Sequence, residues 1–263
     1  MKGQSNMTKI SIIIPCKDEE ETLPHVLKDL TATLATIVGY EFDLIVVDDH
    51  CVDRTAEIAR SFGAKVVQNQ RKGGKGHALR AGFEAAQGDW LLMLDADYSH
   101  RPEELPEFLN AMKPGVGLVI GSRVVGGSEE YNHVRALGNV FLSTMLGLCT
   151  RRYLSDALNG YKLFRRDVFT DFAYTSRNFE IEIEIIANAL RKGYRILEVC
   201  SHERARAGGQ MKSRVIRHGF RFLFRILWEG FKGVKPAQAP TGPGSPVLPA
   251  AVPAVPSAIA KAD

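Results

Sequence analysis

The first half of the chain alternates short apolar runs, rich in β-branched residues, with segments of helical periodicity. The apolar runs lie at residues 10–14, 44–47, 65–67, 90–94 and 118–120. This alternation is typical of an α/β protein, in which helices cover both faces of a mostly parallel, Rossmann-like sheet. Ligands of such sheets bind at the carboxyl ends of the strands, so the functional residues are expected there.

The second half of the chain predicts a different arrangement. Residues 134–149 and 180–192 have helical patterns, and residues 161–164 and 194–199 read as short strands. A basic amphipathic helix follows, and from residue 236 onward proline and alanine dominate, a composition that buries too little apolar surface to fold. We therefore predict a folded domain over residues 1–210, an amphipathic helix over residues 211–235 and an extended, mobile tail over residues 236–263.

Charge and composition exclude several classes of protein. The net charge of +4 is too small to indicate a nucleic-acid partner, and no platform of base-stacking aromatic residues accompanies the basic helix. No apolar run approaches the roughly 20 residues of a membrane-spanning helix. The four cysteines are far apart, which predicts neither a zinc site nor a disulfide framework, and the polar N-terminus shows no export signal. A cytoplasmic location is expected.

Acidic residues follow the first two strands of the predicted sheet. Acidic side chains stand after residues 10–14 where a dinucleotide-binding protein has glycines, which disfavours a conventional NAD site. Asp48, Asp49 and Asp53 follow residues 44–47. Two interpretations stay open for them: a carboxylate can accept hydrogen bonds from a base or a ribose hydroxyl, or it can cap a turn and the next helix.

The sharpest signal is the pair Asp95 and Asp97, which comes directly after the apolar run 90–94. Two carboxylates at i and i+2 can approach one Mg²⁺ or Mn²⁺ ion, which completes its shell with waters and substrate phosphates. The glycine-rich turn 71–77 lacks the spacing of a phosphate loop. We interpret it as a basic turn before a helix at residues 78–86, with a phosphate contact by Lys75 or by the N-terminus of that helix as the alternative.

Five segments in the same order resemble the family 2 glycosyltransferases with the GT-A fold, most closely the branch that includes dolichyl-phosphate mannose synthase. They are residues 12–23, 46–55, 95–102, 121–123 and 156–166, and the likeness extends over residues 9–231. The resemblance implies an inverting, metal-dependent transferase that moves a hexose, mannose or glucose, from a GDP- or UDP-sugar to a polyprenyl phosphate. The alternatives are a family 2 enzyme with a soluble or saccharide acceptor, and a non-catalytic adaptor that binds a nucleotide or a membrane.

The resemblance also implies roles for residues of the donor site. The base and ribose would be lined by Pro15, Glu19, Val47 and Asp49. Donor and metal would be held by Asp95, Ala96 and Asp97, with Ser99 at a position where the family often has a glutamine ligand. The chain departs from the family at Lys17, Asp18, His50 and Cys51, so the base of the donor is not identified.

Basic positions on the acceptor side are implied in the same way. Basic residues around the diphosphate and the acceptor phosphate would be Arg123, Arg135, Arg206 and Lys212. Together with Asp95 and Asp97, the residues Arg123 and Asp156 are the expected catalytic groups. Asp156 and Glu184 are candidate acceptor-side acids, and the alternative is that each orients a neighbouring arginine or lysine.

The basic helix offers a surface for a lipid acceptor. One stripe of the segment 215–231 is apolar and comprises Ile216, Phe220, Leu223, Phe224, Leu227 and Phe231. Arginines occupy another face, a pattern that suits a helix lying in the headgroup plane of a membrane. The alternative is a helix packed on the sheet with a solvated basic face. The first interpretation predicts a cytoplasmic protein associated peripherally with the membrane surface.

Overall fold

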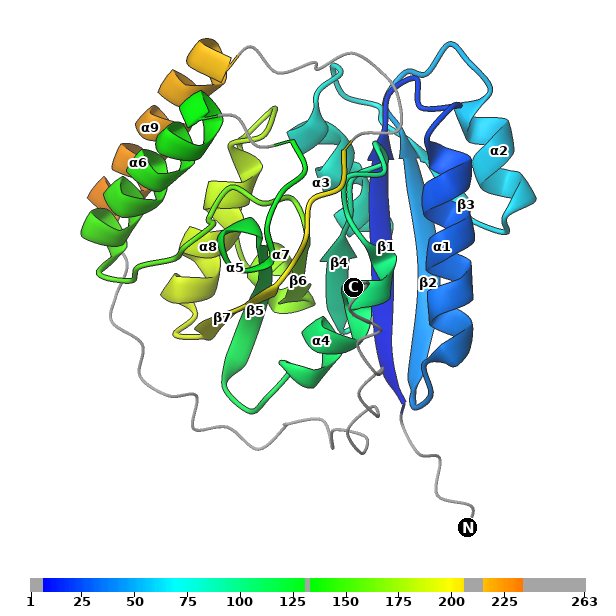
Figure 1. The fold of residues 1–263 in the computed structure, drawn as a ribbon, viewed down its shortest axis with the longest axis horizontal. Helices are drawn as coiled ribbons and strands as arrows, with labels where there is room; N and C mark the ends of the chain where they lie inside the picture. Colours follow the sequence, from blue (N-terminus) through cyan, green and yellow to red (C-terminus); the bar gives the residue numbers. More distant parts are fainter. Residues whose placement is uncertain (1–6, 131–132, 206–214, 234–263) are drawn as a thin grey trace, which may run out of the picture.

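A computed structural model describes residues 7–130, 133–205 and 215–233. It confirms the predicted α/β fold: helices cover both faces of a mostly parallel sheet (Figure 1). The strands are β1 (Thr8–Cys16), β2 (Tyr40–Asp48), β3 (Lys65–Gln68), β4 (Trp90–Met93), β5 (Val116–Ser122), β6 (Lys162–Arg165) and β7 (Arg195–Cys200). The helices are α1 (Leu23–Thr36), α2 (Thr55–Ser61), α3 (Lys75–Ala85), α4 (Leu105–Asn110), α5 (Arg123–Gly126), α6 (His133–Thr150), α7 (Arg166–Thr170), α8 (Ile181–Arg191) and α9 (Val215–Phe231).

The strand order is β3-β2-β1-β4-β6-β5-β7, and β6 is antiparallel to both of its neighbours. The first residue of β6, Lys162, pairs with Met93 of β4 and with Ile120 of β5. Because β6 runs the opposite way, it begins at the edge where β4 and β5 end. The loop that precedes β6 therefore meets the residues that follow β4 and β5, Asp95 and Arg123 among them.

Alternate side chains of the strands pack into two hydrophobic cores, one on each face of the sheet. Ile10, Ile12 and Ile14 of β1 pack with α1 and α4, whereas Ile13 packs with α3 and α8 on the other face. Strands buried on both faces read as continuous apolar runs, which is why the run 10–14 was recognisable in the sequence.

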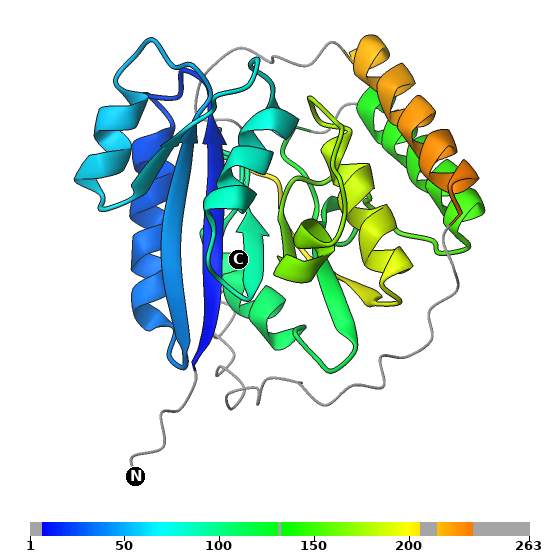
Figure 2. The ribbon, with the colours of Figure 1, turned by 180° about the vertical axis from the view of Figure 1, so that it is seen from behind.

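Helix α9 lies beside α6 and against α8, at the end of the molecule remote from α1 and α2 (Figures 1 and 2). Ile226 of α9 is fully buried in the same core as α3 and α8, and Phe222 and Leu223 pack against that core. Phe220, Phe224, Leu227, Trp228 and Phe231 are exposed. The single apolar stripe that we predicted is therefore incomplete: Leu223 of the stripe faces the core, and α9 has a second apolar side that is buried.

No helix within the described ranges is both long and apolar enough to cross a bilayer. The start of the predicted amphipathic segment, residues 211–214, and the predicted tail, residues 236–263, lie outside the described residues.

Close packing of α3 on the sheet makes Gly82 a test of the fold. A Cβ at Gly82 would lie 2.8 Å from Cγ2 of Val47 and closer still to Cγ2 of Ile13. We expect Gly82→Ala to lower the free energy of unfolding by about 1–3 kcal/mol, because the core must shift to admit a methyl group. Urea denaturation measures the change.

The matched control is Gly138→Ala in α6, where a Cβ would meet nothing within 4 Å. That variant should gain about 0.5–1 kcal/mol, since alanine is the better helix former. A Gly82→Ala protein as stable as the wild type would contradict the close contact between α3 and β1.

Candidate functional site

Asp95 stands where β4 ends, and its carboxylate is held by a lysine. The Lys75 ammonium, at the start of α3, lies 2.7 Å from Oδ1 and 2.9 Å from Oδ2 of Asp95. Nε2 of His100 lies 3.5 Å from Oδ2. Burial alone would raise the pKa of Asp95, but Lys75 and His100 hold that pKa well below its usual range. Asp95 is thus a carboxylate whose charge is already compensated.

Lys75 itself is enclosed by a second acid and an aromatic ring. Its ammonium lies 3.1 Å from Oε1 of Glu182 in α8 and 5.0 Å from the centre of the Phe179 ring. Burial would lower the pKa of Lys75, but the two carboxylates raise it above the ordinary value. On the other side of Glu182, the fully buried Lys162 lies 3.7 Å from Oε2.

The sequence reasoning missed Glu182 and Lys162 and considered Lys75 only as a phosphate contact. A signal was present in each case, because Glu182 interrupts the apolar pattern of α8 and Lys162 interrupts the strand 161–164. A charge within an apolar run must find a buried partner, so both residues could have been selected on that ground.

Gly160 lets the loop before β6 approach the charged pair. A Cβ at Gly160 would lie 2.7 Å from Oδ2 of Asp95 and 3.0 Å from Nζ of Lys75. The preceding Asn159 turns the loop by accepting the N–H of Tyr161 on its side-chain oxygen. The backbone of residues 159–161 therefore forms one wall of the site around Asp95.

Asp97 and Ser99 lie in the turn after Asp95. Oδ1 of Asp97 accepts the N–H of Ser99 at 3.1 Å and its hydroxyl at 2.6 Å, and Ser99 is buried. Ala96 is buried in the core between the two aspartates. Carboxylate oxygens are the hard ligands that Mg²⁺ and Mn²⁺ prefer, so the donor set of Asp95 and Asp97 fits such an ion. The Ser99 hydroxyl therefore donates its hydrogen bond to Asp97.

The acids at the end of β2 and directly after it accept hydrogen bonds from backbone N–H groups. Asp49 accepts the N–H of Gly74 at 2.8 Å and the side-chain amide of Asn69 at 2.6 Å. Asp48 accepts the N–H of Cys51, and Asp53 accepts the N–H groups of Glu20 and Thr55. These contacts match the interpretation in which the acids cap turns and the start of α2. Asp49 in particular ties the end of β2 to the turn that carries Lys75.

The residues predicted for the base and ribose are only partly together. Glu19 lines a pocket of about 220 Å³ with Asp18, Glu20, Glu21, Thr22 and Asp53. Pro15 and Val47 are paired in neighbouring strands, but the Val47 side chain is fully buried in the core, so only its backbone can face a ligand.

Asp18, Cys51 and Asp53 are the one group of three that could hold a metal ion within the described part of the chain. Burial raises the pKa of Cys51 to about 11, so the group is a thiol at neutral pH.

A second cluster surrounds Arg123, directly after β5. Its guanidinium lies 2.7 Å from Oδ2 of the fully buried Asp156 and 3.1 Å from Oε1 of Glu203. Asn139 of α6 donates to Asp156 as well, at 2.8 Å. Burial would raise the pKa of Asp156, but Arg123 lowers it. Because Asp156 and Gly160 belong to one loop, the Arg123 cluster and the Asp95 cluster are connected through five residues.

The other predicted residues are dispersed. Arg135 pairs with Glu130 at 3.4 Å, while Arg206 and Lys212 lie outside the described residues. Glu184 accepts the N–H groups of Thr175 and Ser176 and pairs with Arg225 of α9 at 3.0 Å. Asp156 and Glu184 thus each hold an arginine, as the alternative interpretation of these acids expects.

The chain is similar to proteins of a known family. Residues 11–172 match the family model described as "Glycosyl transferase family 2". The chain is 30% identical over 234 residues to "Dolichol-phosphate mannosyltransferase" of Pyrococcus furiosus, which covers 84% of the chain and 65% of that protein. It is 28% identical to "Dolichyl-phosphate hexose transferase" of Haloferax volcanii, over 76% of the chain and 84% of the relative. The chain thus spans just under two thirds of the Pyrococcus relative.

Among solved structures, a similar fold occurs in glucosyl-3-phosphoglycerate synthase from Mycobacterium tuberculosis in complex with Mn²⁺, uridine diphosphate and phosphoglyceric acid. The TM-score is 0.67 at 21% sequence identity, and the match covers 87% of this chain and 80% of the synthase. At this identity the likeness concerns the fold, and it agrees with the predicted GT-A architecture.

The buried pair of Asp156 and Arg123 predicts a pH-dependent contribution to stability. A lowered folded-state pKa means that this contribution is complete above the ordinary aspartate pKa of about 4 and is lost as the pH falls through the folded-state value. We expect Asp156→Asn to cost about 3 kcal/mol at pH 7, with the difference from wild type shrinking below pH 4. Urea denaturation at several pH values measures both effects.

The control is Asp89→Asn, because Asp89 is exposed at the start of β4. It should leave stability unchanged at every pH. A constant difference between Asp156→Asn and wild type across the acid range would contradict the assigned ion pair.

Proposed function

The chain belongs to glycosyl transferase family 2, and on this basis we propose that it transfers a hexose, mannose or glucose, from a nucleotide sugar to a polyprenyl phosphate at a membrane surface. The named activities of the Pyrococcus and Haloferax relatives support the lipid acceptor. The observation that carries the proposal is an exposed apolar surface on α6 and α9, next to the loop and helix residues that form the site.

The donor would bind at the carboxyl ends of β1, β2 and β4. Asp97 and Asp95 would hold Mg²⁺ or Mn²⁺, in keeping with the Mn²⁺ and uridine diphosphate of the structurally similar synthase. A bound divalent cation stabilises the negative charge that develops on a departing diphosphate. The chain's own contribution is to fix Asp95 through Lys75 and to keep Asp97 oriented through Ser99.

The acceptor phosphate would need cations more than a strong base. A phosphate monoester has a second pKa of about 6, so its oxygen is already anionic near neutral pH. Arg123 is the described cation best placed after β5, and its guanidinium is fixed by Asp156 and Glu203 while 20% of the side chain stays exposed. In this proposal Asp156 orients Arg123, because a carboxyl with a lowered pKa is a poor proton acceptor.

The protein would bind the membrane through the neighbouring faces of α6 and α9. The exposed apolar side chains are Val134, Leu137, Val140, Phe141 and Leu148 of α6 and Phe220, Phe224, Leu227, Trp228 and Phe231 of α9. Exposed apolar surface on this scale is characteristic of an interaction site. Asn139 of α6, between Leu137 and Val140 in sequence, is bonded to Asp156, so the helix that would face the lipid also contacts the site.

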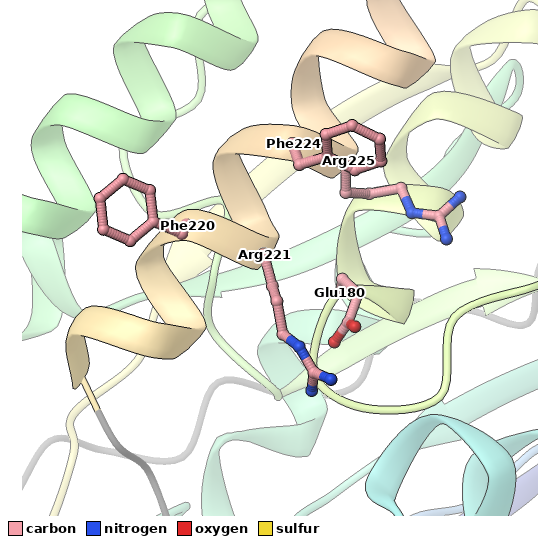
Figure 3. Close-up of a pocket in the computed structure, with 5 residues that line it drawn as sticks. All are labelled: Glu180, Phe220, Arg221, Phe224 and Arg225. Carbon is pink, nitrogen blue, oxygen red and sulfur yellow. The ribbon is translucent and has the colours of Figure 1, made fainter.

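The flank of α9 combines apolar rings with cations. Figure 3 shows Arg221 extending from α9 toward Glu180, with Phe220 and Phe224 on the same helix. Together with Arg225 these residues line a pocket of about 250 Å³. Rings beside guanidinium groups are the composition of a helix that lies at the boundary between acyl chains and headgroups.

The transfer reaction gives the direct test. Incubation of the protein with radiolabelled UDP- or GDP-hexose, a polyprenyl phosphate and Mn²⁺ should carry the label into the organic phase. Asp97→Ala should lower the rate by about 100-fold or more, because stabilisation of the leaving diphosphate is lost. Asp89→Asn is the matched control and should keep the wild-type rate.

Label that reaches only water-soluble products, such as those formed with phosphoglyceric acid, would remove the lipid acceptor and favour a soluble one. A protein that binds nucleotide but transfers no label to either acceptor would contradict the enzyme proposal and favour an adaptor.

Membrane docking through α9 has its own test. We expect the double substitution Phe224→Glu with Trp228→Glu to weaken binding to vesicles of anionic phospholipid by roughly tenfold or more, since each buried aromatic side chain contributes about 1.5–3 kcal/mol. Co-sedimentation with the vesicles measures it. Val38→Glu, at an exposed valine between α1 and β2, is the control and should bind as the wild type does. Equal binding by both variants would contradict docking through this surface.

A further inference from the structure

We propose that Lys75 is an internal counter-ion that makes divalent-cation binding at Asp95 and Asp97 depend on a bound nucleotide. The inference rests on the proposed donor site and concerns its equilibrium properties rather than the transfer reaction. Lys75 acts here as a positioning residue, because its ammonium contacts the carboxylate of Asp95.

Lys75 and a divalent cation would compete for one carboxylate, that of Asp95. Nζ of Lys75 lies within 3 Å of both oxygens of Asp95. A divalent ion that approaches Asp95 therefore meets a carboxylate whose charge is already compensated, and it meets a fixed positive charge within a few ångström. In a partly desolvated site this repulsion is much stronger than in water.

Lys75 cannot simply move away from Asp95. Its side chain is 11% exposed, and α3 begins at this residue, so its backbone is fixed by the helix. Glu182 holds the ammonium from one side and the Phe179 ring packs on it. The close approach of Gly160 removes space on a further side. The ammonium is therefore a permanent charge of the site.

Glu182 shares its negative charge between two lysines. Its Oε1 faces Lys75 and its Oε2 faces Lys162. Because Glu182 compensates part of the charge of Lys75, it weakens the attraction between Lys75 and Asp95. Loss of the Glu182 charge should leave Lys75 to Asp95 alone and make the site more positive.

Linkage then gives the functional consequence. A nucleoside diphosphate brings negative charge that offsets Lys75 and supplies oxygen ligands for the ion. The nucleotide should therefore raise the affinity for the ion, and the ion must raise the affinity for the nucleotide by the same factor. A site built in this way stays largely free of metal until the donor arrives.

The experiment is a Mn²⁺ titration of the full chain, with free Mn²⁺ followed by electron paramagnetic resonance, in the absence and presence of UDP or GDP. Without nucleotide, Lys75→Met should bind Mn²⁺ roughly tenfold more tightly than the wild type, since the competing charge is gone. Its enhancement by nucleotide should shrink by a similar factor. Lys75→Arg keeps the charge and should stay close to the wild type.

Glu182→Gln should act in the opposite direction and weaken Mn²⁺ binding without nucleotide. A purely structural role of the cluster would lower affinity in both variants, so the opposite signs separate the two explanations. Lys72→Met removes an exposed lysine from the same turn and should change neither affinity.

The inference is overturned if folded Lys75→Met binds Mn²⁺ no more tightly than the wild type, or if Glu182→Gln binds it equally well or better. Thermal unfolding of each variant establishes that it is folded. If Lys75→Met does not fold, the two single variants Glu182→Gln and Lys75→Arg decide the question: the first should bind Mn²⁺ more weakly than the wild type, and the second about as well. Because the titration needs neither sugar nor acceptor, its result is independent of whether the lipid-transfer assay succeeds.

Discussion

The ion pair between Lys75 and Asp95 is the contact on which the arrangement of the site depends. It joins the start of α3 to the end of β4, and through Glu182 it joins both to the start of α8. Burying a lysine is unfavourable unless its charge is matched, so the pair requires these elements to converge at one edge of the sheet. Gly160 contributes by leaving space for the loop before β6. Because β6 is antiparallel to β4 and β5, that loop lies at the edge of the sheet where β4 and β5 end.

The alternation of apolar runs and helical patterns predicted the fold because it depends on local periodicity. Every predicted strand is present, and the main helices appear within a few residues of their predicted positions. The antiparallel direction of β6 could not be predicted, because it follows from how the chain crosses between β5 and β6 and leaves no trace in a four-residue strand. The second apolar side of α9 was missed for a related reason: Phe222 and Ile226 lie off the main stripe, and their burial depends on where α6 and α8 lie.

The candidate site was predictable in its positions and less so in its contacts. Asp95 and Asp97 were predicted as metal ligands from their place after an apolar run, and this role stays a prediction. Lys75, the partner of Asp95 twenty residues earlier, and Glu182, many residues later, become neighbours only through the sheet order. The same holds for Asp156, whose link to Arg123 requires β5 and the loop before β6 to lie side by side. Spacing in sequence identifies groups that act from one turn, whereas charge compensation across the sheet needs the tertiary structure.

Helix α8 connects the proposed donor site with α9, the helix proposed to face the membrane. Glu182 and Glu184 stand two residues apart in its first turn, and on a helix this spacing directs side chains to different sides. Glu182 turns toward Lys75 and the donor residues, while Glu184 pairs with Arg225 of α9, which also binds Glu229. Glu184 further holds the backbone of Thr175 and Ser176, and the next residue, Arg177, bonds to the turn that carries Lys75. The helix with the exposed apolar face is therefore connected, through Arg225, Glu184 and the segment 175–177, to the same turn that positions Asp95.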